Sequence, residues 1–188
     1  MDKAAELSNT EAAMRAASLP LSTNLIFGEG DVNAKIMFIG EAPGRDEDAQ
    51  IRPFVGRGGQ LLRQCLRDAG YREAEVYITN IVKRRPPDNR DPLPEEIIAY
   101  QPYLTRQIQI IAPRVIIPLG RFAMNYFLPA AKITQDQGKV FLISGRYILP
   151  MLHPAAALRS PEMMRAFRGT FAKLPKIVAK CEALSSII

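Results

Sequence analysis

Short apolar runs recur along the chain and predict the strands of a sheet. Four of them are rich in Ile, Val and Leu and are bounded by polar, glycine or proline residues, as buried strands are. They cover Lys35–Ile39, Glu75–Thr79, Arg114–Leu119 and Arg146–Leu152. The apolar segment 139–143 lies just before Ser144-Gly145 and can form a hairpin with the last run. One antiparallel strand would then be added to the sheet.

The segments between these runs carry apolar residues at helical spacing. Gly59–Ala69 ends directly before Gly70, and glycine is a frequent C-terminal stop for a helix. Strands that alternate with helices predict an α/β fold with a mainly parallel sheet covered on both faces. The expected helices are Thr10–Ser18, Gly59–Ala69, Pro94–Ile111, Gly120–Phe127 and Ser160–Cys181, the last broken near Pro175 because proline interrupts helical hydrogen bonding.

Residues with chemical potential directly follow the predicted strands. The loop 40–44 (GEAPG) follows the first strand, and Asn80 ends the second. Gly120-Arg121 follows the third strand, and His153 follows the fourth. The carboxyl ends of parallel strands meet at one edge of a sheet, where ligands bind. We therefore expect these four features to converge on one site.

Length and composition bound the kind of protein. The chain has 188 residues, 47% of them hydrophobic, which suits one domain with a sizeable core. We expect a single domain over 1–188, with 1–23 as an N-terminal helical segment packed on it. No apolar run reaches the length of a membrane span, and the N-terminus lacks the apolar core of a signal peptide. A cytoplasmic protein is expected, and nothing in the sequence demands more than a monomer.

The net charge of +6 suits a polyanionic partner, although a basic protein without such a partner could have the same charge. The position of the charge is more informative, because the basic residues gather in two segments. These segments contain Lys83, Arg84, Arg85 and Arg90, and Arg159, Arg165 and Arg168.

Cysteine and histidine are scarce. Cys65 and Cys181 are far apart in the sequence and neither belongs to a CxxC pair, while His153 is the only histidine. A metal site built from cysteines or histidines is therefore not expected, nor is a disulfide in a cytosolic protein.

Each strand-end feature has a chemical and a structural interpretation. The glycines and proline of the loop 40–44 would let backbone amides approach a ligand, or would simply form a tight turn. The Asn80 amide offers a donor and an acceptor that can read a base edge, or it forms a turn. His153 can donate a hydrogen bond to an oxygen on which negative charge develops, or it is structural.

Together, the ordered segments resemble the uracil-DNA glycosylase superfamily, most closely its thermostable bacterial and archaeal branch, family four. The matching blocks are IGEAPGRDED, RPFVGRGGQLL, VYITNIVKRRPPDNRDP, PEEI, QIQIIAPRVIIPLG and LHPAAALR. The resemblance implies a three-layer α/β/α sandwich around a central four-stranded, mainly parallel sheet.

The resemblance also implies roles for individual residues. Phe54 would stack on a flipped uracil, and Asn80 would bind its O4 and N3 edge and so reject cytosine. His153 would stabilise O2 as the glycosidic bond breaks. Further pocket residues would be Gly40, the backbone of Glu41 and Ala42, which would hold the base and the water, and Glu47, which would orient the water or crowd the uracil C5.

The same resemblance implies where DNA would lie. Leu158 and Arg159 occupy the loop that enters the minor groove in this family, where an apolar wedge helps to fill the space left by the flipped base. The expected DNA contacts are Lys83, Arg84, Arg85, Pro154, Leu158 and Arg159.

The chain departs from the family at the cofactor. Family-four enzymes normally carry a [4Fe–4S] cluster on four cysteines, and the matching positions here are Ala16, Leu19, Arg84 and Tyr100. We therefore expect no cluster. Ala16, Leu19 and Tyr100 would pack in its place, and Arg84 would reach an acid or a phosphate.

The leading hypothesis is a monofunctional DNA repair glycosylase that hydrolyses the N-glycosidic bond of deoxyuridine in single- or double-stranded DNA and leaves an abasic site, without metal or cofactor. The alternative is a weakly active or inactive module that binds uracil-containing DNA. An unrelated nucleotide-binding protein is disfavoured because the chain lacks a GxGxxG or GxxxxGK[ST] phosphate loop.

Overall fold

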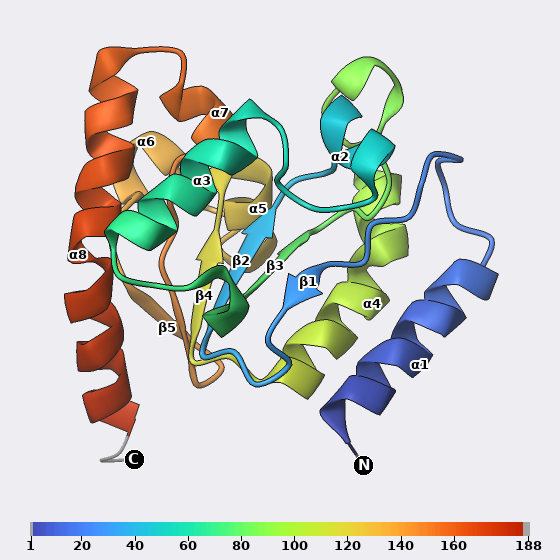
Figure 1. Ribbon diagram of the computed structural model, residues 1–188, viewed down its shortest axis with the longest axis horizontal. Coiled ribbons are helices and arrows are strands. Elements are labelled where there is room, and N and C mark those ends of the chain that lie inside the picture. The colour runs from blue at the N-terminus through green and yellow to red at the C-terminus, as the bar shows by residue number, and fades with distance from the viewer. Residues whose placement is uncertain (1, 186–188) are drawn as a thin grey trace.

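The computed structural model describes residues 2–185, and within them a six-stranded sheet forms the centre of the molecule (Figure 1). Its strands are β1 (Glu29–Gly30), β2 (Ile36–Gly40), β3 (Val76–Asn80), β4 (Val115–Pro118), β5 (Phe141–Ile143) and β6 (Arg146–Ile148), in the spatial order β1-β3-β2-β4-β6-β5. The strands β3, β2, β4 and β6 run parallel, whereas β1 and β5 pair antiparallel at the two edges.

This sheet contains the four parallel strands expected, and two more. The strand β5 is the hairpin partner that the apolar segment 139–143 indicated. The strand β1 is only two residues long, too short to leave a hydrophobic pattern. The sheet therefore exceeds the four-stranded prediction by its antiparallel edges.

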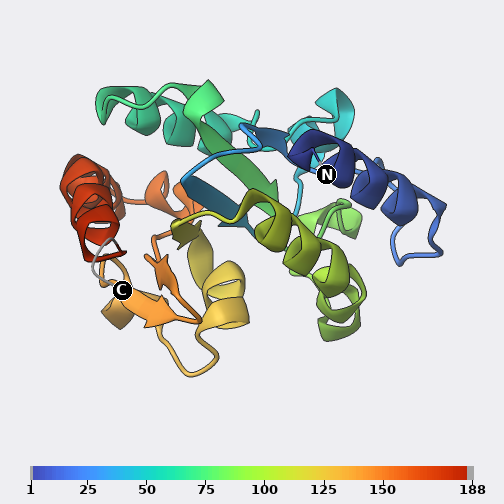
Figure 2. The ribbon, with the colours of Figure 1, turned by 90° about the horizontal axis from the view of Figure 1, so that it is seen from below.

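Helices cover both faces of the sheet (Figure 2). They are α1 (Lys3–Ala16), α2 (Arg45–Gln50), α3 (Arg57–Asp68), α4 (Pro94–Ile111), α5 (Gly120–Phe127), α6 (Ile133–Asp136), α7 (Pro154–Ala157) and α8 (Pro161–Ser185), with 3-10 turns η1 (Glu73–Glu75) and η2 (Pro87–Asn89). None of the helices in the described part of the chain is both long enough and apolar enough to pass through a lipid bilayer.

The alternation of side chains along the strands divides the core into two layers. In β2, Ile36 and Phe38 pack with the side chains of α3 and α8, whereas Met37 and Ile39 pack with those of α1 and α4. Because every residue of β2 is buried, both faces of this strand are covered. The expected three-layer α/β/α sandwich is confirmed.

The last helix is continuous, so the expected break near Pro175 was wrong. Pro175 is exposed, while Phe167, Phe171 and Leu174 lie buried on the opposite side of α8. This apolar stripe extends beyond the proline to Val178, so tertiary packing holds both halves of the helix against the sheet.

The first helix begins earlier than its sequence pattern indicated. It starts at Lys3. The preceding residue, Asp2, caps the helix because its side chain accepts a hydrogen bond from the Ala4 N–H. Its buried residues Leu7 and Met14 belong to the same core as α4. The segment that follows α1 returns to the sheet, where the Ile26 N–H donates to the Lys83 carbonyl at 2.8 Å.

Candidate active site

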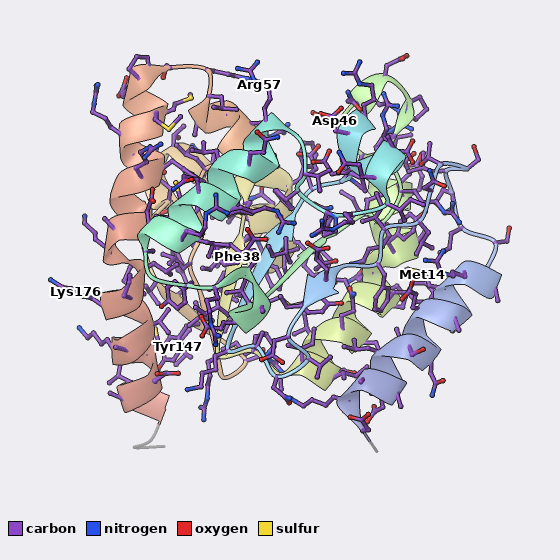
Figure 3. The ribbon with its side chains drawn as sticks, in the orientation of Figure 1. Met14, Phe38, Asp46, Arg57, Tyr147 and Lys176 are labelled. Atoms are coloured by element: carbon purple, nitrogen blue, oxygen red, sulfur yellow. The ribbon has the colours of Figure 1, made fainter. Side chains whose placement is uncertain are left out.

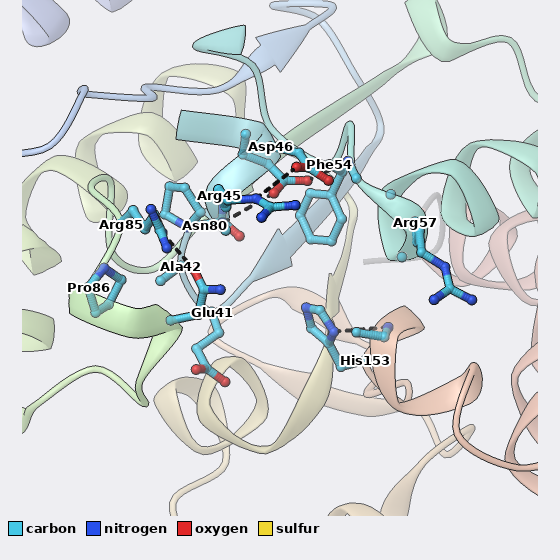
Figure 4. A pocket seen from close by; sticks show the side chains of 18 of the residues that line it. Glu41, Ala42, Arg45, Asp46, Phe54, Arg57, Asn80, Arg85, Pro86 and His153 are labelled. Carbon is cyan, nitrogen blue, oxygen red and sulfur yellow. Dashed lines mark hydrogen bonds and ion pairs between the residues drawn. The ribbon is translucent and has the colours of Figure 1, made fainter. Parts of the chain in front are cut away.

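A cleft of about 830 Å³ opens at the carboxyl ends of the parallel strands (Figure 4). Its walls come from the β2–α3 segment, the loop between β3 and α4, and α7. Phe54, Asn80 and His153, which are far apart in the sequence, all line it. Three of the four strand-end features expected to converge therefore line the cleft, whereas Gly120-Arg121 is not among its lining residues.

Two strand ends meet tightly at the floor of the cleft. Gly40 and Asn80 are register partners at the ends of β2 and β3. A Cβ on Gly40 would lie 2.4 Å from both Asn80 Oδ1 and Phe54 Cζ, so only glycine fits here. Asn80 is buried, and its Oδ1 has no hydrogen-bond partner among the residues that the structure describes. A buried acceptor without a donor is costly, so this oxygen is poised for an N–H from a ligand.

The Phe54 ring forms one wall of the cleft, and the backbone around it is unusual. Its φ angle is +54°, in the left-handed region that disfavours side chains with a Cβ. The Phe54 carbonyl accepts from Arg63 Nε at 3.0 Å, and a Cβ on Gly59 would lie 2.0 Å from this carbonyl. The strained conformation is therefore held by a close helix contact. The ring centroid lies 5.9 Å from that of His153, at an interplanar angle of 32°.

His153 precedes α7 and serves as its N-cap. Its Nδ1 accepts from the Ala155 N–H at 3.2 Å, so Nε2 carries the proton of the neutral ring. Burial lowers the pKa of His153 to about 4; the charge of Glu47 opposes this shift and that of Arg159 adds to it. A Cβ on Gly120 would lie 3.0 Å from His153 Cβ, so this glycine lets α5 pack against the histidine. The site thus holds a neutral imidazole with an N–H donor.

Glu47 braces the loops of the cleft. Its Oε1 accepts from the Val55 N–H at 2.9 Å and the Gly56 N–H at 2.8 Å, and its Oε2 accepts from the Gly44 N–H at 3.2 Å. The Glu47 carboxylate, which the family resemblance assigned to the water or the uracil C5, thus accepts hydrogen bonds from three backbone N–H groups. Its contacts are those of a positioning residue, because they fix the segment on either side of Phe54.

Glu41 lies in the cleft, but its carboxyl group points away from the Phe54 ring (Figure 4). Burial raises the pKa of Glu41 to about 7; the nearby Asp91 adds to this shift and Arg121 opposes it. Arg121 is ion-paired with Asp91 at 3.2 Å. The cleft therefore contains a carboxyl group that can gain or lose a proton near neutral pH. The neighbouring Ala42 also lines the cleft.

Three expected DNA contacts are buried or hydrogen-bonded within the protein. Lys83 is fully buried, and its Nζ donates to the Phe27 carbonyl at 3.3 Å and to the Thr79 hydroxyl and Gln107 Oε1. Burial lowers the pKa of the Lys83 ammonium well below its ordinary value. Pro154 is buried too. Arg84 donates to the Thr23 carbonyl, a backbone acceptor rather than the expected acid or phosphate.

The other three lie at or beside the cleft mouth. Arg85 and Arg159 line the cleft, and Arg85 Nε donates to Asn89 Oδ1 at 2.6 Å. The Leu158 side chain is 39% exposed directly after α7, which suits an apolar residue that meets a ligand.

The residues at the expected cofactor positions do not fit an iron–sulfur cluster. Tyr100 is fully buried, and its hydroxyl donates to the Pro20 carbonyl at 2.6 Å. Leu19 packs against the same core as Tyr100, whereas Ala16 is exposed, contrary to the packing expected for it. None of these side chains is a thiolate.

The two cysteines lie elsewhere. Cys65 and Cys181 are buried in the core on the α3 and α8 side, opposite the layer that contains Tyr100. Within residues 2–185, no three His, Cys, Asp or Glu side chains are grouped as a metal site would require.

Sequence reasoning missed the role of one residue in shaping the cleft. Gly59 lies in the first turn of α3, where its missing side chain makes room for the Phe54 carbonyl. A signal was present in the sequence, because Gly59 is the first residue of the predicted helix Gly59–Ala69 and glycine is unfavourable in a helix.

Comparison with known proteins agrees with this geometry. A model of the uracil DNA glycosylase superfamily matches residues 27–175. The Type-4 uracil-DNA glycosylase of Archaeoglobus fulgidus is 42% identical over 84% of this chain and 84% of its own length. That of Thermotoga maritima is 42% identical over 84% and 85%, and that of Saccharolobus solfataricus is 44% identical over 87% and 77%. The chain belongs to the uracil DNA glycosylase superfamily.

Proposed function

We propose that this protein excises uracil from DNA by hydrolysing the bond between uracil N1 and the deoxyribose C1′. The observation that carries the proposal is the buried, unpartnered Asn80 Oδ1 in a cleft that Phe54 and His153 also line. The names of the Type-4 relatives support the same activity.

The amide of Asn80 matches one edge of uracil. Its Oδ1 would accept the N3–H of uracil, and its Nδ2 would donate to O4. Cytosine presents an amino donor and an unprotonated N3 at this edge, so both interactions would be lost. The Phe54 ring would stack on the base, and the backbone of Gly40, Glu41 and Ala42 would enclose it.

The imidazole of His153 would act on the leaving group. As the N1–C1′ bond breaks, its electron pair passes to the uracil ring and negative charge develops at O2. A neutral Nε2–H donor aimed at O2 stabilises this charge in the transition state, which is worth about 3–4 kcal/mol for one such donor in other enzymes. Water then adds to C1′ and loses a proton, which leaves an abasic site.

Glu47 and Glu41 would have different parts. Glu47 holds the backbone of the loops in place, so it is a positioning residue. Glu41 has a pKa of about 7 and lies within the cleft, so it can take the proton that the attacking water releases.

Several finer features belong to the same proposal. The chain would act as a monomer and a single domain inside the cell, on single- or double-stranded DNA that contains uracil. It would do so without a [4Fe–4S] cluster, because Tyr100 and Arg84 occupy cysteine positions. Iron and sulfide analysis of anaerobically purified protein tests this point, and stoichiometric iron with visible cluster absorption would refute it.

The activity is tested with an oligonucleotide that contains one deoxyuridine. Free uracil and alkali-labile sites should appear together, and matched thymine and cytosine oligonucleotides should remain intact. The matched control is His153→Ala. If the unsubstituted protein releases no more uracil than His153→Ala does, the proposal is refuted. Tight binding to the oligonucleotide without release of uracil would support the alternative of an inactive binding module.

A further inference from the structure

A second groove, of about 560 Å³, lies beside the cleft between α3 and the α7–α8 segment. Four of its lining residues are arginines, namely Arg57, Arg63, Arg67 and Arg168, and the exposed Leu158 lies at its border. Arg57 lines both the groove and the uracil cleft, so the two depressions are adjacent.

The arginines differ in how far acids neutralise them. Arg63 pairs with Glu29 at 2.6 Å and also with Glu73, and Arg67 pairs with Glu73 at 2.9 Å. These two arginines therefore hold α3 against its neighbours and offer little free charge.

Arg57 and Arg168 remain available to a ligand. Arg57 is exposed and has no acidic partner among the residues that the structure describes. Figure 4 shows its side chain directed away from Phe54, toward the outside of the cleft. Arg168 is exposed, and its contact with Asp68 is long, at 3.8 Å.

The position of Arg57 is unfavourable for the isolated fold. It is the first residue of α3, where the helix dipole disfavours positive charge. The Glu47 carboxylate accepts the Gly56 N–H beside this helix start, but Arg57 forms no ion pair within residues 2–185, so its exposed guanidinium is free to bind an anionic ligand.

We propose that this groove binds the phosphodiester backbone of the strand that carries the uracil, on one side of the flipped nucleotide, with Arg57 and Arg168 each contacting a phosphate. The inference rests on the proposed function for its choice of DNA. Charge complementarity and the position of the groove next to the uracil cleft, with Arg57 lining both, favour this occupant.

The test uses the double variant Arg57→Gln/Arg168→Gln. Its affinity is measured between 50 and 300 mM salt on a single-stranded oligonucleotide with one hydrolysis-resistant deoxyuridine analogue. Two lost phosphate contacts should reduce the slope of log affinity against log salt by about 1.4, since each contact contributes about 0.7 on single strands. Affinity should fall about tenfold at low salt.

Two controls match this variant. Lys176→Gln removes a charge from the same helix, two turns further on and outside the groove, and should leave the slope unchanged (Figure 3). Arg57→Lys/Arg168→Lys keeps both charges and should retain most of the slope. Because Arg57→Gln removes an unfavourable helix-dipole interaction, the melting temperature should not fall, which separates a binding defect from misfolding.

Strand position completes the test. With the uracil close to one end of the oligonucleotide, the defect should disappear for one of the two ends and persist for the other. An unchanged salt slope, or an equal defect with both end-placed substrates, would overturn the groove proposal. If the double variant loses the expected slope but the unsubstituted protein releases no uracil, only the proposed activity is refuted and the groove proposal stands.

Discussion

Replacing His153 tests whether a neutral imidazole supports catalysis. His153→Ala removes the Nε2–H donor, which the Ala155 N–H fixes by occupying Nδ1. Loss of one such donor typically lowers the rate constant about 100- to 1,000-fold, or about 3–4 kcal/mol. The interaction strengthens only as charge develops on O2, so the rate of release should fall far more than the affinity for DNA.

The pKa of about 4 adds a second, independent expectation. His153 stays neutral at every pH above about 5, so it should cause no change in rate between pH 5 and 8. An inflection near pH 7 would belong to Glu41, whose pKa is raised to about 7, and it should vanish in Glu41→Gln.

The same shift has a consequence for stability. The folded pKa lies below the unfolded value of 6.5, so the unfolded chain binds the proton more readily and stability is lost as pH falls from 6.5 to 4. The loss is about 2 kcal/mol at pH 5 and about 3 kcal/mol at pH 4. His153→Asn, which cannot titrate here, should lack this component.

The assays are single-turnover release of uracil, chemical denaturation at several pH values, and NMR titration of the imidazole. The chain contains one histidine, so its ring resonance needs no assignment. A ring that titrates near 6.5 in the folded protein would refute the buried neutral donor. A His153→Ala variant within tenfold of the parent rate would refute its role at O2.

Four further substitutions separate pocket shape, loop support, core stability and DNA binding. Gly40→Ala places a Cβ 2.4 Å from Asn80 Oδ1 and Phe54 Cζ, so kcat/KM should fall more than about 100-fold while the circular dichroism spectrum stays unchanged. A near-normal rate of uracil release would show that the pocket tolerates this methyl group. Glu47→Ala removes the acceptor of three amide hydrogen bonds and should lower both kcat/KM and the free energy of unfolding, the latter by about 2–4 kcal/mol. Hydrogen bonds to charged groups contribute about 1.5–3 kcal/mol each, and amides that become exposed regain part of this from water. A loss of rate with unchanged stability would instead indicate that Glu47 contacts the reacting atoms directly. Lys83→Met should change the melting temperature but not the slope of log affinity for DNA against log salt, because Lys83 is buried. Arg85→Gln, in the cleft wall, should reduce that slope by about 1. A changed slope in Lys83→Met would mean that this lysine reaches DNA.

The fold was predictable where burial left a pattern in the sequence. The parallel strands are covered on both faces, so they read as continuous apolar runs. The helix α2 left no such pattern, because it has no buried residue and lies in an acidic loop. The break expected at Pro175 was wrong because proline has a low helix propensity, whereas the packing of α8 against the core keeps the helix continuous.

The site was predictable to the extent that strand ends determine it. Gly40, Asn80 and His153 meet because parallel strands share one carboxyl edge. Lys83 was misassigned because its partner Gln107 lies in α4, distant in the sequence, and the sequence does not show that a lysine after a strand turns inward. The three amides around Glu47 come from two separated loop segments, so its bracing role could not be foreseen.

The segment between α1 and β1 links Tyr100 and Arg84 to the loops of the cleft. Tyr100 holds this segment through the Pro20 carbonyl, and Arg84 holds it through the Thr23 carbonyl. The next residue, Asn24, donates its backbone N–H to Asp48 Oδ1 and its side-chain amide to the Asp48 carbonyl, both at 2.9 Å. Asp48 belongs to α2, which also carries Glu47. The hydrogen bonds of Tyr100 and Arg84 therefore hold this segment where Asn24 contacts the helix whose carboxylate braces the loop around Phe54.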